Sequence, residues 1–221
     1  MKPQILLERS TTPDGCEIVL YERDGVYTIR VGGMELMSSR AHGSEEDMAD
    51  LVLAELAARR PRVLVGGLGM GFTLRAVLDR LPAGGEAVVA ELLPDVVSWN
   101  REHLAHLART PLDDPRVTVV EDDVARVMTE SPAAFDAILL DVDNGPAALT
   151  DRRNADLYRE RGLAVVRRSL RTPGVLGVWS ASPDRRFERV LRRAGFSVRT
   201  ETVHARRGSK GPRHTIFIAT I

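Results

Sequence analysis

Polar side chains that could move a proton gather in LLDVDNGP, residues 139–146, directly after an apolar run. If that run is a buried strand, Asp141, Asp143 and Asn144 emerge at the carboxyl edge of a sheet, where open α/β folds bind their ligands. Carboxylates at such an edge can hold a cationic amine and accept the proton that an attacking amine sheds. These three residues are the predicted catalytic group. The alternative is that one of them only caps a helix or stabilises the turn at Gly145-Pro146.

A glycine-rich turn, VLVGGLGMG, occupies residues 63–71. Glycines remove β-carbons where a predicted strand becomes a helix, so the backbone can approach a ligand and the helix N-terminus can point at it. A tight turn that needs glycine for its own geometry is the alternative. No Gly-Lys-Ser/Thr follows, which excludes a P-loop. The predicted nucleotide-contacting glycines are Gly66, Gly67, Gly69 and Gly71.

Acidic residues also follow the next two predicted strands. Glu91 ends the second strand, where a carboxylate can accept hydrogen bonds from both hydroxyls of a ribose. Asp122 and Asp123 follow the third strand, and either could accept a hydrogen bond from an adenine amino group. Helix capping is the alternative role for all three acids. Together with the glycine turn, they predict an adenosine-containing ligand.

Runs of Val, Leu and Ile alternate with amphipathic segments from residue 62 onward. This alternation is typical of an α/β fold with a doubly wound, mainly parallel sheet that is covered on both faces. The last two runs are joined by a connection too short for a parallel crossover, so the final strand is expected to be antiparallel. That ending is typical of class I S-adenosylmethionine-dependent transferases. The seven predicted strands span residues 62–66, 86–91, 116–121, 135–141, 174–180, 196–203 and 214–221.

The N-terminal part has a different pattern. Four short strand-like runs lie within residues 5–38, and Asp24-Gly25 between two of them predicts a hairpin. A helix is expected to follow, with Ser44 as its N-cap and Pro61 as its end. We therefore predict an antiparallel β appendage over residues 1–43 and a Rossmann-like nucleotide-binding transferase domain over residues 44–221.

Composition excludes several classes of function. The 221 residues include 31 basic and 31 acidic side chains, a balance that gives no general attraction to nucleic acid or anionic lipid. No apolar run approaches the ~18–20 residues that span a bilayer, and the N-terminus lacks the pattern of a secretory signal. The single cysteine, Cys16, cannot form an internal disulfide, and no metal-ligand spacing of His and Cys is present. We expect a cytoplasmic protein with no metal site, no membrane partner and no nucleic-acid partner.

Four segments resemble, in order and spacing, the polyamine aminopropyltransferases, the spermidine synthases and their bacterial relatives. The segments are RVLVGGLGMGFTLRAVL, VVAELLPDVV, RVTVVEDDVARVM and FDAILLDVDNGP. The resemblance implies transfer of an aminopropyl group from decarboxylated S-adenosylmethionine to a small-molecule amine such as putrescine, with release of methylthioadenosine. It places Glu91 at the ribose, Asp123 at the adenine and Asp141 at the catalytic carboxylate position. It also implies a homodimer, and short isolated strands need such a packing partner.

The sequence departs from the family's pattern around the acceptor site. Met70 stands where the family's glycine turn carries an acid, and Asn144 stands where its loop carries a second one. The family's glutamine and Tyr-x-Glu elements have no match. His42 and Glu45 occupy that region as candidate substrate contacts, and Tyr158 is a third candidate.

Three functions therefore remain open at this level. The first is aminopropyl transfer, which the acids Asp141 and Asp143 favour because they suit a cationic amine. The second is methyl transfer from ordinary S-adenosylmethionine to an unknown acceptor, which Met70 favours because an aminopropyl amine would prefer an acid at that place. The third is nucleotide binding without catalysis, against which the presence of Asp141 argues.

Overall fold

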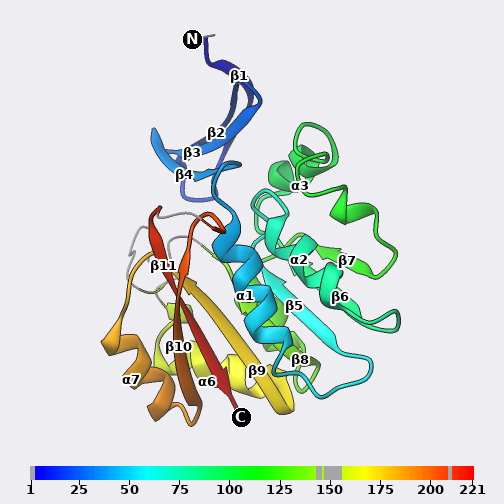
Figure 1. The fold of residues 1–221 in the computed structure, drawn as a ribbon, viewed down its shortest axis with the longest axis vertical. Coiled ribbons are helices and arrows are strands. Elements are labelled where there is room, and N and C mark those ends of the chain that lie inside the picture. Colours follow the sequence, from blue (N-terminus) through cyan, green and yellow to red (C-terminus); the bar gives the residue numbers. More distant parts are fainter. Residues whose placement is uncertain (1–2, 143–145, 147–155, 209–210) are drawn as a thin grey trace.

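A small antiparallel sheet forms the N-terminal part of the chain (Figure 1). In this computed structural model, residues 3–142, 146, 156–208 and 211–221 are described. The predicted hairpin at Asp24-Gly25 is confirmed, with φ angles of 53° and 75° that belong to a tight left-handed turn. In that described part, the small sheet has the order β1-β2-β3-β4, with strands β1 (Ile5–Thr11), β2 (Glu17–Arg23), β3 (Val26–Val31) and β4 (Met34–Ser38).

A second, larger sheet confirms the predicted α/β class. Over the described residues it has seven strands in the order β10-β11-β9-β8-β5-β6-β7. The five strands from β5 to β9 run parallel, whereas β11 is antiparallel to both of its neighbours, as the short final connection predicted. The strands are β5 (Arg62–Gly66), β6 (Glu86–Ala90), β7 (Val117–Val120), β8 (Phe135–Leu140), β9 (Leu170–Ser180), β10 (Ser197–His204) and β11 (Arg213–Thr220).

Helices cover both faces of the larger sheet, and each face has its own apolar cluster. Side chains from α1, α2 and α3 pack with Val63 and Val65 of β5, while those from α4, α6 and α7 pack with Leu64 between them. This alternation along one strand buries β5 on both sides, as a doubly wound sheet requires. The helices are α1 (Gly43–Leu53), α2 (Phe72–Arg80), α3 (Pro94–Arg101), α4 (Val124–Glu130), α6 (Glu160–Ser169) and α7 (Arg185–Arg193), and a 3₁₀ turn covers Pro111–Asp113.

Helix α1 crosses one face of the sheet and differs from its predicted bounds. Its N-cap is His42 rather than Ser44, and it ends at Leu53, well before Pro61. The side chain of Ser44 is fully buried and bonded to partners outside the helix, which removes it from a capping role. A β-carbon at Gly177 of β9 would lie 2.4 Å from a methyl group of Val52, so glycine there lets α1 lie directly on the sheet.

The small sheet is tied to the larger unit through several of its strands, among them β3, whose Tyr27 packs edge-on against His106. On β1, Glu8 pairs with His103 at 3.0 Å and Ser10 donates a hydrogen bond to Asp95 at the start of α3. On β4, the Met37 thioether lies against Gly69 of the glycine turn, within about 3.1 Å of where a β-carbon would stand. The small sheet thus helps to hold the glycine turn, and a domain boundary at residue 43 stays a prediction. Each described helix is too short or too polar to cross a bilayer.

Candidate active site

The carboxyl ends of β8, β5, β6 and β7 lie side by side at one edge of the larger sheet. Because these strands are parallel, the residues that follow them meet there. This brings together four of the predicted positions, namely the glycine turn, Glu91, the Asp122–Asp123 pair and Asp141. The structure therefore assembles one site from segments that lie up to 75 residues apart in the sequence, between Gly66 and Asp141.

The glycine turn has the backbone conformation that its sequence predicted. Gly67, Gly69 and Gly71 have φ angles of 86°, 53° and 81°, in the left-handed region. A β-carbon at Gly67 would lie 2.7 Å from the carbonyl oxygen of Asp141, so the turn and the end of β8 are in direct backbone contact. This geometry agrees with both predicted roles of these glycines, a tight strand-to-helix turn and close approach of a ligand to the backbone.

Met70 points into the protein. Its side chain is 3% exposed and packs in the same apolar cluster as Leu68. The turn therefore offers a ligand backbone groups at this position and no side-chain acid.

Glu91 is a buried carboxylate held by backbone amides. Its Oε2 accepts a hydrogen bond from Leu68 N at 2.9 Å, and its Oε1 accepts one from Leu93 N at 2.9 Å. Burial raises the pKa of the Glu91 carboxyl, and the backbone N–H groups act against that rise. Glu91 thereby joins the glycine turn to the segment that enters α3.

Asp122 and Asp123 have local hydrogen bonds at the start of α4. Asp123 is the N-cap of that helix, and its Oδ1 accepts a hydrogen bond from Ala125 N at 2.8 Å. Asp122 Oδ1 accepts one from Asp123 N at 2.8 Å, and its Oδ2 lies 3.4 Å from the Arg126 guanidinium. Asp123 is therefore a helix cap, which was the alternative to ligand contact. The cap uses its Oδ1 atom and does not use its Oδ2 atom.

Asp141 sits at the end of β8 beside the N-terminus of α2. Its Oδ2 accepts a hydrogen bond of 2.5 Å from the hydroxyl of Thr73, the second residue of α2. Burial raises the pKa of Asp141, and the Thr73 hydrogen bond lowers it. Sequence reasoning missed Thr73, although its place directly after the glycine turn was a usable signal.

Glu45, in the first turn of α1, faces the same region. Burial is the main cause that raises its pKa to about 8, and the nearby Asp141 carboxylate adds to the rise. Two carboxyl groups in one partly buried site cannot both ionise readily, so they are expected to share a proton near neutral pH. The structure thus brings the sequence candidates Glu45 and Asp141 into electrostatic contact.

Tyr158 lies behind the strand end. It is 7% exposed, packs edge-on against Phe187, and its hydroxyl lies 3.3 Å from the carbonyl oxygen of Val142. This position holds the backbone just beyond Asp141. The other two members of the predicted catalytic group, Asp143 and Asn144, lie outside the described residues.

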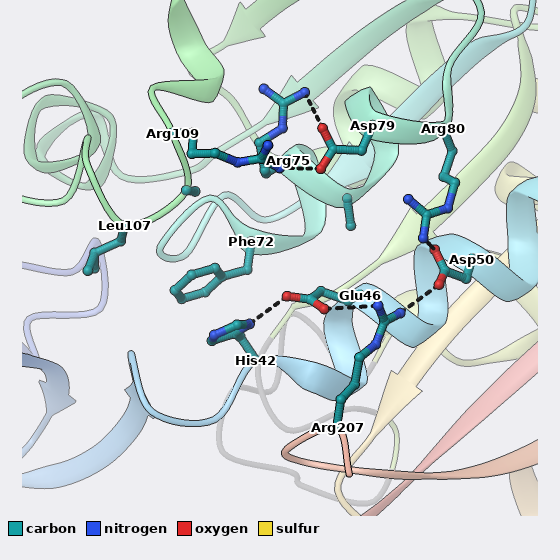
Figure 2. A pocket seen from close by; sticks show the side chains of 12 residues that line it. His42, Glu46, Asp50, Phe72, Arg75, Asp79, Arg80, Leu107, Arg109 and Arg207 are labelled. Carbon is teal, nitrogen blue, oxygen red and sulfur yellow. Dashed lines mark hydrogen bonds and ion pairs between the residues drawn. The ribbon is translucent and has the colours of Figure 1, made fainter.

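His42 lies in a neighbouring pocket of about 230 Å³ between α1, α2 and the segment 107–109 (Figure 2). Its ring stacks on Phe72 with centroids 4.1 Å apart, and its Nδ1 lies 2.8 Å from Glu46 Oε1. Asp141 and Glu45 are not among the described residues that line this pocket. His42 and Glu46 line this pocket, whereas the described hydrogen bonds of Asp141 and Glu45 are to Thr73 and Ser44.

One group of described side chains has metal-ligand character. The candidate ligand atoms of Glu8, Glu102 and His103 all lie within 4.8 Å of one another. The Glu8–His103 pair explains this proximity, and the group joins β1 to the end of α3 rather than facing the strand ends. The described groups that act on Asp141 and Glu45 are carboxyl and hydroxyl groups.

Comparison with known proteins places the chain in a family. The family model described as spermine/spermidine synthase domain matches residues 41–186. Polyamine aminopropyltransferase 2 of Pseudomonas aeruginosa is 36% identical over 131 residues, which cover 57% of this chain and 35% of that protein. Polyamine aminopropyltransferase of Mycobacterium tuberculosis is 31% identical over 198 residues, which cover 85% of this chain and 36% of that protein.

The fold agrees with that of a solved structure. The crystal structure of spermidine synthase from Thermotoga maritima superposes with a TM-score of 0.75 at 20% identity, and the match covers 97% of this chain and 72% of that one. The chain spans only about a third of the length of the curated relatives it matches.

Proposed function

This chain belongs to the spermine/spermidine synthase family, and from that premise we propose that it transfers an aminopropyl group from decarboxylated S-adenosylmethionine to a small amine. The observation that carries the proposal is the position of the Asp141 carboxyl group, which lies at the end of β8 in backbone contact with the glycine turn and accepts a hydrogen bond from Thr73, with Glu45 near enough to oppose its ionisation. Such a pair suits an acceptor that arrives as an ammonium ion and must lose a proton.

The nucleotide is assigned to the edge formed by β5, β6 and β7. We propose that Glu91 accepts hydrogen bonds from the ribose hydroxyls, because it directly follows β6 at this edge and a carboxylate oxygen can accept more than one hydrogen bond. Asp123 Oδ2 or Asp122 is proposed for the adenine amino group. The glycines admit the ligand close to the backbone, with the N-terminus of α2 beyond them.

In the proposed reaction, Asp141 and Glu45 hold the acceptor ammonium and Asp141 takes its proton. The freed amine attacks the carbon next to the sulfonium, the N–C bond forms as the C–S bond breaks, and methylthioadenosine leaves with the bonding electrons. A base with a raised pKa suits this step, since general-base efficiency is best when the pKa is near the operating pH. Thr73 keeps the Asp141 carboxylate oriented.

A second candidate, methyl transfer from ordinary S-adenosylmethionine, is favoured by one observation. Met70 is buried, so the glycine turn offers no acid to the amine of an aminopropyl group. Calorimetric titration with decarboxylated S-adenosylmethionine, S-adenosylmethionine and methylthioadenosine separates the two functions. We expect the decarboxylated nucleotide to bind more tightly than the intact one, and the opposite preference would favour methyl transfer.

We also propose that the chain forms a homodimer. Exposed apolar side chains on the small sheet, Ile5, Leu6 and Met34, would gain by burial against a second copy. Light scattering is expected to give twice the chain mass, and a monomer mass at micromolar concentration would contradict this. The cytoplasmic location stays a prediction.

A further inference from the structure

The buried hydroxyl of Ser44 lies at the centre of a hydrogen-bond network. Ser44 is 0% exposed, and its Oγ has three side-chain partners from three elements. Glu45 Oε2 lies at 2.6 Å, His214 Nδ1 of β11 at 2.8 Å, and Trp179 Nε1 of β9 at 3.0 Å. The network therefore links the acid pair of the proposed active site to a histidine on a distant strand.

Two arrangements satisfy all of these groups with a neutral His214 ring, and they differ in the protonation of Glu45. A hydroxyl donates one hydrogen bond and accepts two, and the Trp179 indole can only donate. If Glu45 is ionised, Ser44 donates to Glu45 and accepts from His214, whose proton must then be on Nδ1. If Glu45 is protonated, it donates to Ser44, and Ser44 donates to a His214 ring that carries its proton on Nε2.

We infer that Ser44 and His214 form a proton relay that carries away the proton which the acid pair takes from the amine acceptor. In each passage Glu45 gives its proton to Ser44 Oγ, Ser44 gives its own hydroxyl proton to His214 Nδ1, and the ring releases its Nε2 proton to water. The ring then holds its proton on Nδ1 and must return to the Nε2 tautomer by exchange with water before the next passage. Per passage, one proton leaves Glu45 and one reaches the solvent. The relay rests on the proposed amine chemistry, and Ser44 and His214 act in it as positioning residues.

The surroundings favour such transfer. Asp141 at the end of β8 and Glu46 on α1 are the charged groups that act on Glu45, while Arg207 is bound by Glu46, Asp47 and Asp50. His214 faces Trp179, whose ring lies edge-on with centroids 4.5 Å apart. Burial lowers the pKa of His214, so its ring is neutral at rest and able to receive a proton.

The direct test follows the His214 ring nitrogens by ¹⁵N NMR in the full chain. The His214→Asn variant, in which that signal is missing, assigns the resonance. As the pH is raised through about 8, where Glu45 titrates, the ring proton is expected to move from Nε2 to Nδ1. Ser44→Ala should abolish this switch, and the matched control Trp179→Phe should keep it. A His214 tautomer that does not change with pH, or that changes equally in Ser44→Ala, would overturn the relay.

A kinetic test separates proton transfer from a structural hydrogen bond. Asparagine at position 214 can still bond to Ser44 but cannot titrate, so His214→Asn should lower kcat by about 100-fold and alter its pH profile, with KM unchanged. Wild-type kcat and pH profile in His214→Asn would overturn the inference even if the switch is seen. Failure of the proposed function can be told apart from failure of the relay. If the proposed function is wrong, the wild-type chain shows no aminopropyl transfer. The NMR test of the relay does not depend on turnover.

Discussion

Two carboxyl sites at the same sheet edge, Glu91, which is buried, and the partly buried pair Asp141 and Glu45, are built in opposite ways. Glu91 is bonded by two backbone N–H groups, which are fixed donors that favour its ionised form. Asp141 and Glu45 each have a hydroxyl partner, Thr73 and Ser44, and they oppose each other's ionisation. The first arrangement holds a carboxyl group in one orientation, and the second allows a proton to move between neighbouring groups.

The different partners of Glu91 and of the Asp141–Glu45 pair suit them to different tasks, ligand binding for Glu91 and proton transfer for the pair. A carboxylate fixed by backbone amides keeps its orientation and can accept hydrogen bonds from ligand hydroxyls. A coupled pair with a raised pKa gives up or takes a proton at low cost. We therefore expect variants of Glu91 to affect nucleotide affinity and variants of the acid pair to affect turnover.

The largest effect is expected for Asp141→Asn. The amide keeps the shape and one acceptor oxygen but cannot take a proton, so kcat should fall by about 10²- to 10⁴-fold. Methylthioadenosine affinity, measured by calorimetry on the same preparation, should stay unchanged. An active variant with reduced stability would show that Asp141 serves only the loop that follows β8.

Glu91→Gln should have the opposite signature. The amide retains one acceptor but places an NH₂ group against a backbone N–H, so nucleotide binding should weaken by about 1.5–3 kcal/mol, or about ten- to hundredfold. Because Glu91 also holds the glycine turn and the entry to α3, the midpoint of thermal unfolding should fall as well. Unchanged affinity would remove the ribose assignment.

Thr73 offers a smaller and more selective change. Thr73→Val removes the hydroxyl donor to Asp141 at constant shape and should cost about 0.5–1.5 kcal/mol in transition-state stabilisation. The pH profile of kcat should shift to higher pH, because loss of this hydrogen bond raises the pKa of Asp141 further. Thr73→Ser, which keeps the donor, is the matched control, and an equal effect of both variants would refute the role of the hydroxyl.

The smallest effect concerns stability and pH. The folded chain keeps a proton on Glu45 that the unfolded chain loses above pH 4.5, so the free energy of unfolding should decrease as the pH rises from 4.5 to about 8. Glu45→Gln removes this contribution, and denaturant unfolding across that range should give a flatter dependence on pH. An identical slope in both proteins would mean that Glu45 titrates normally.

The sequence predicted the strands and the convergence of the site well, because those features depend on local pattern. The Val-rich runs of β5 to β8 and the Asp24-Gly25 turn carry their structure in neighbouring residues. The partners of the acids could not be predicted, since Thr73 meets Asp141 across 68 positions and His214 meets Ser44 across 170. The predicted N-cap of α1 was wrong for a similar reason, because the Ser44 hydroxyl is hydrogen-bonded to Trp179 and His214, which are distant in the sequence.

The most direct measurement of the central claim is the mass of the reaction product. The chain is incubated with a panel of small amines and either decarboxylated or intact S-adenosylmethionine, and the products are analysed by mass spectrometry. We predict an amine heavier by one aminopropyl group together with methylthioadenosine, formed only from the decarboxylated nucleotide and formed far more slowly by Asp141→Asn. A methylated product formed from intact S-adenosylmethionine would contradict it.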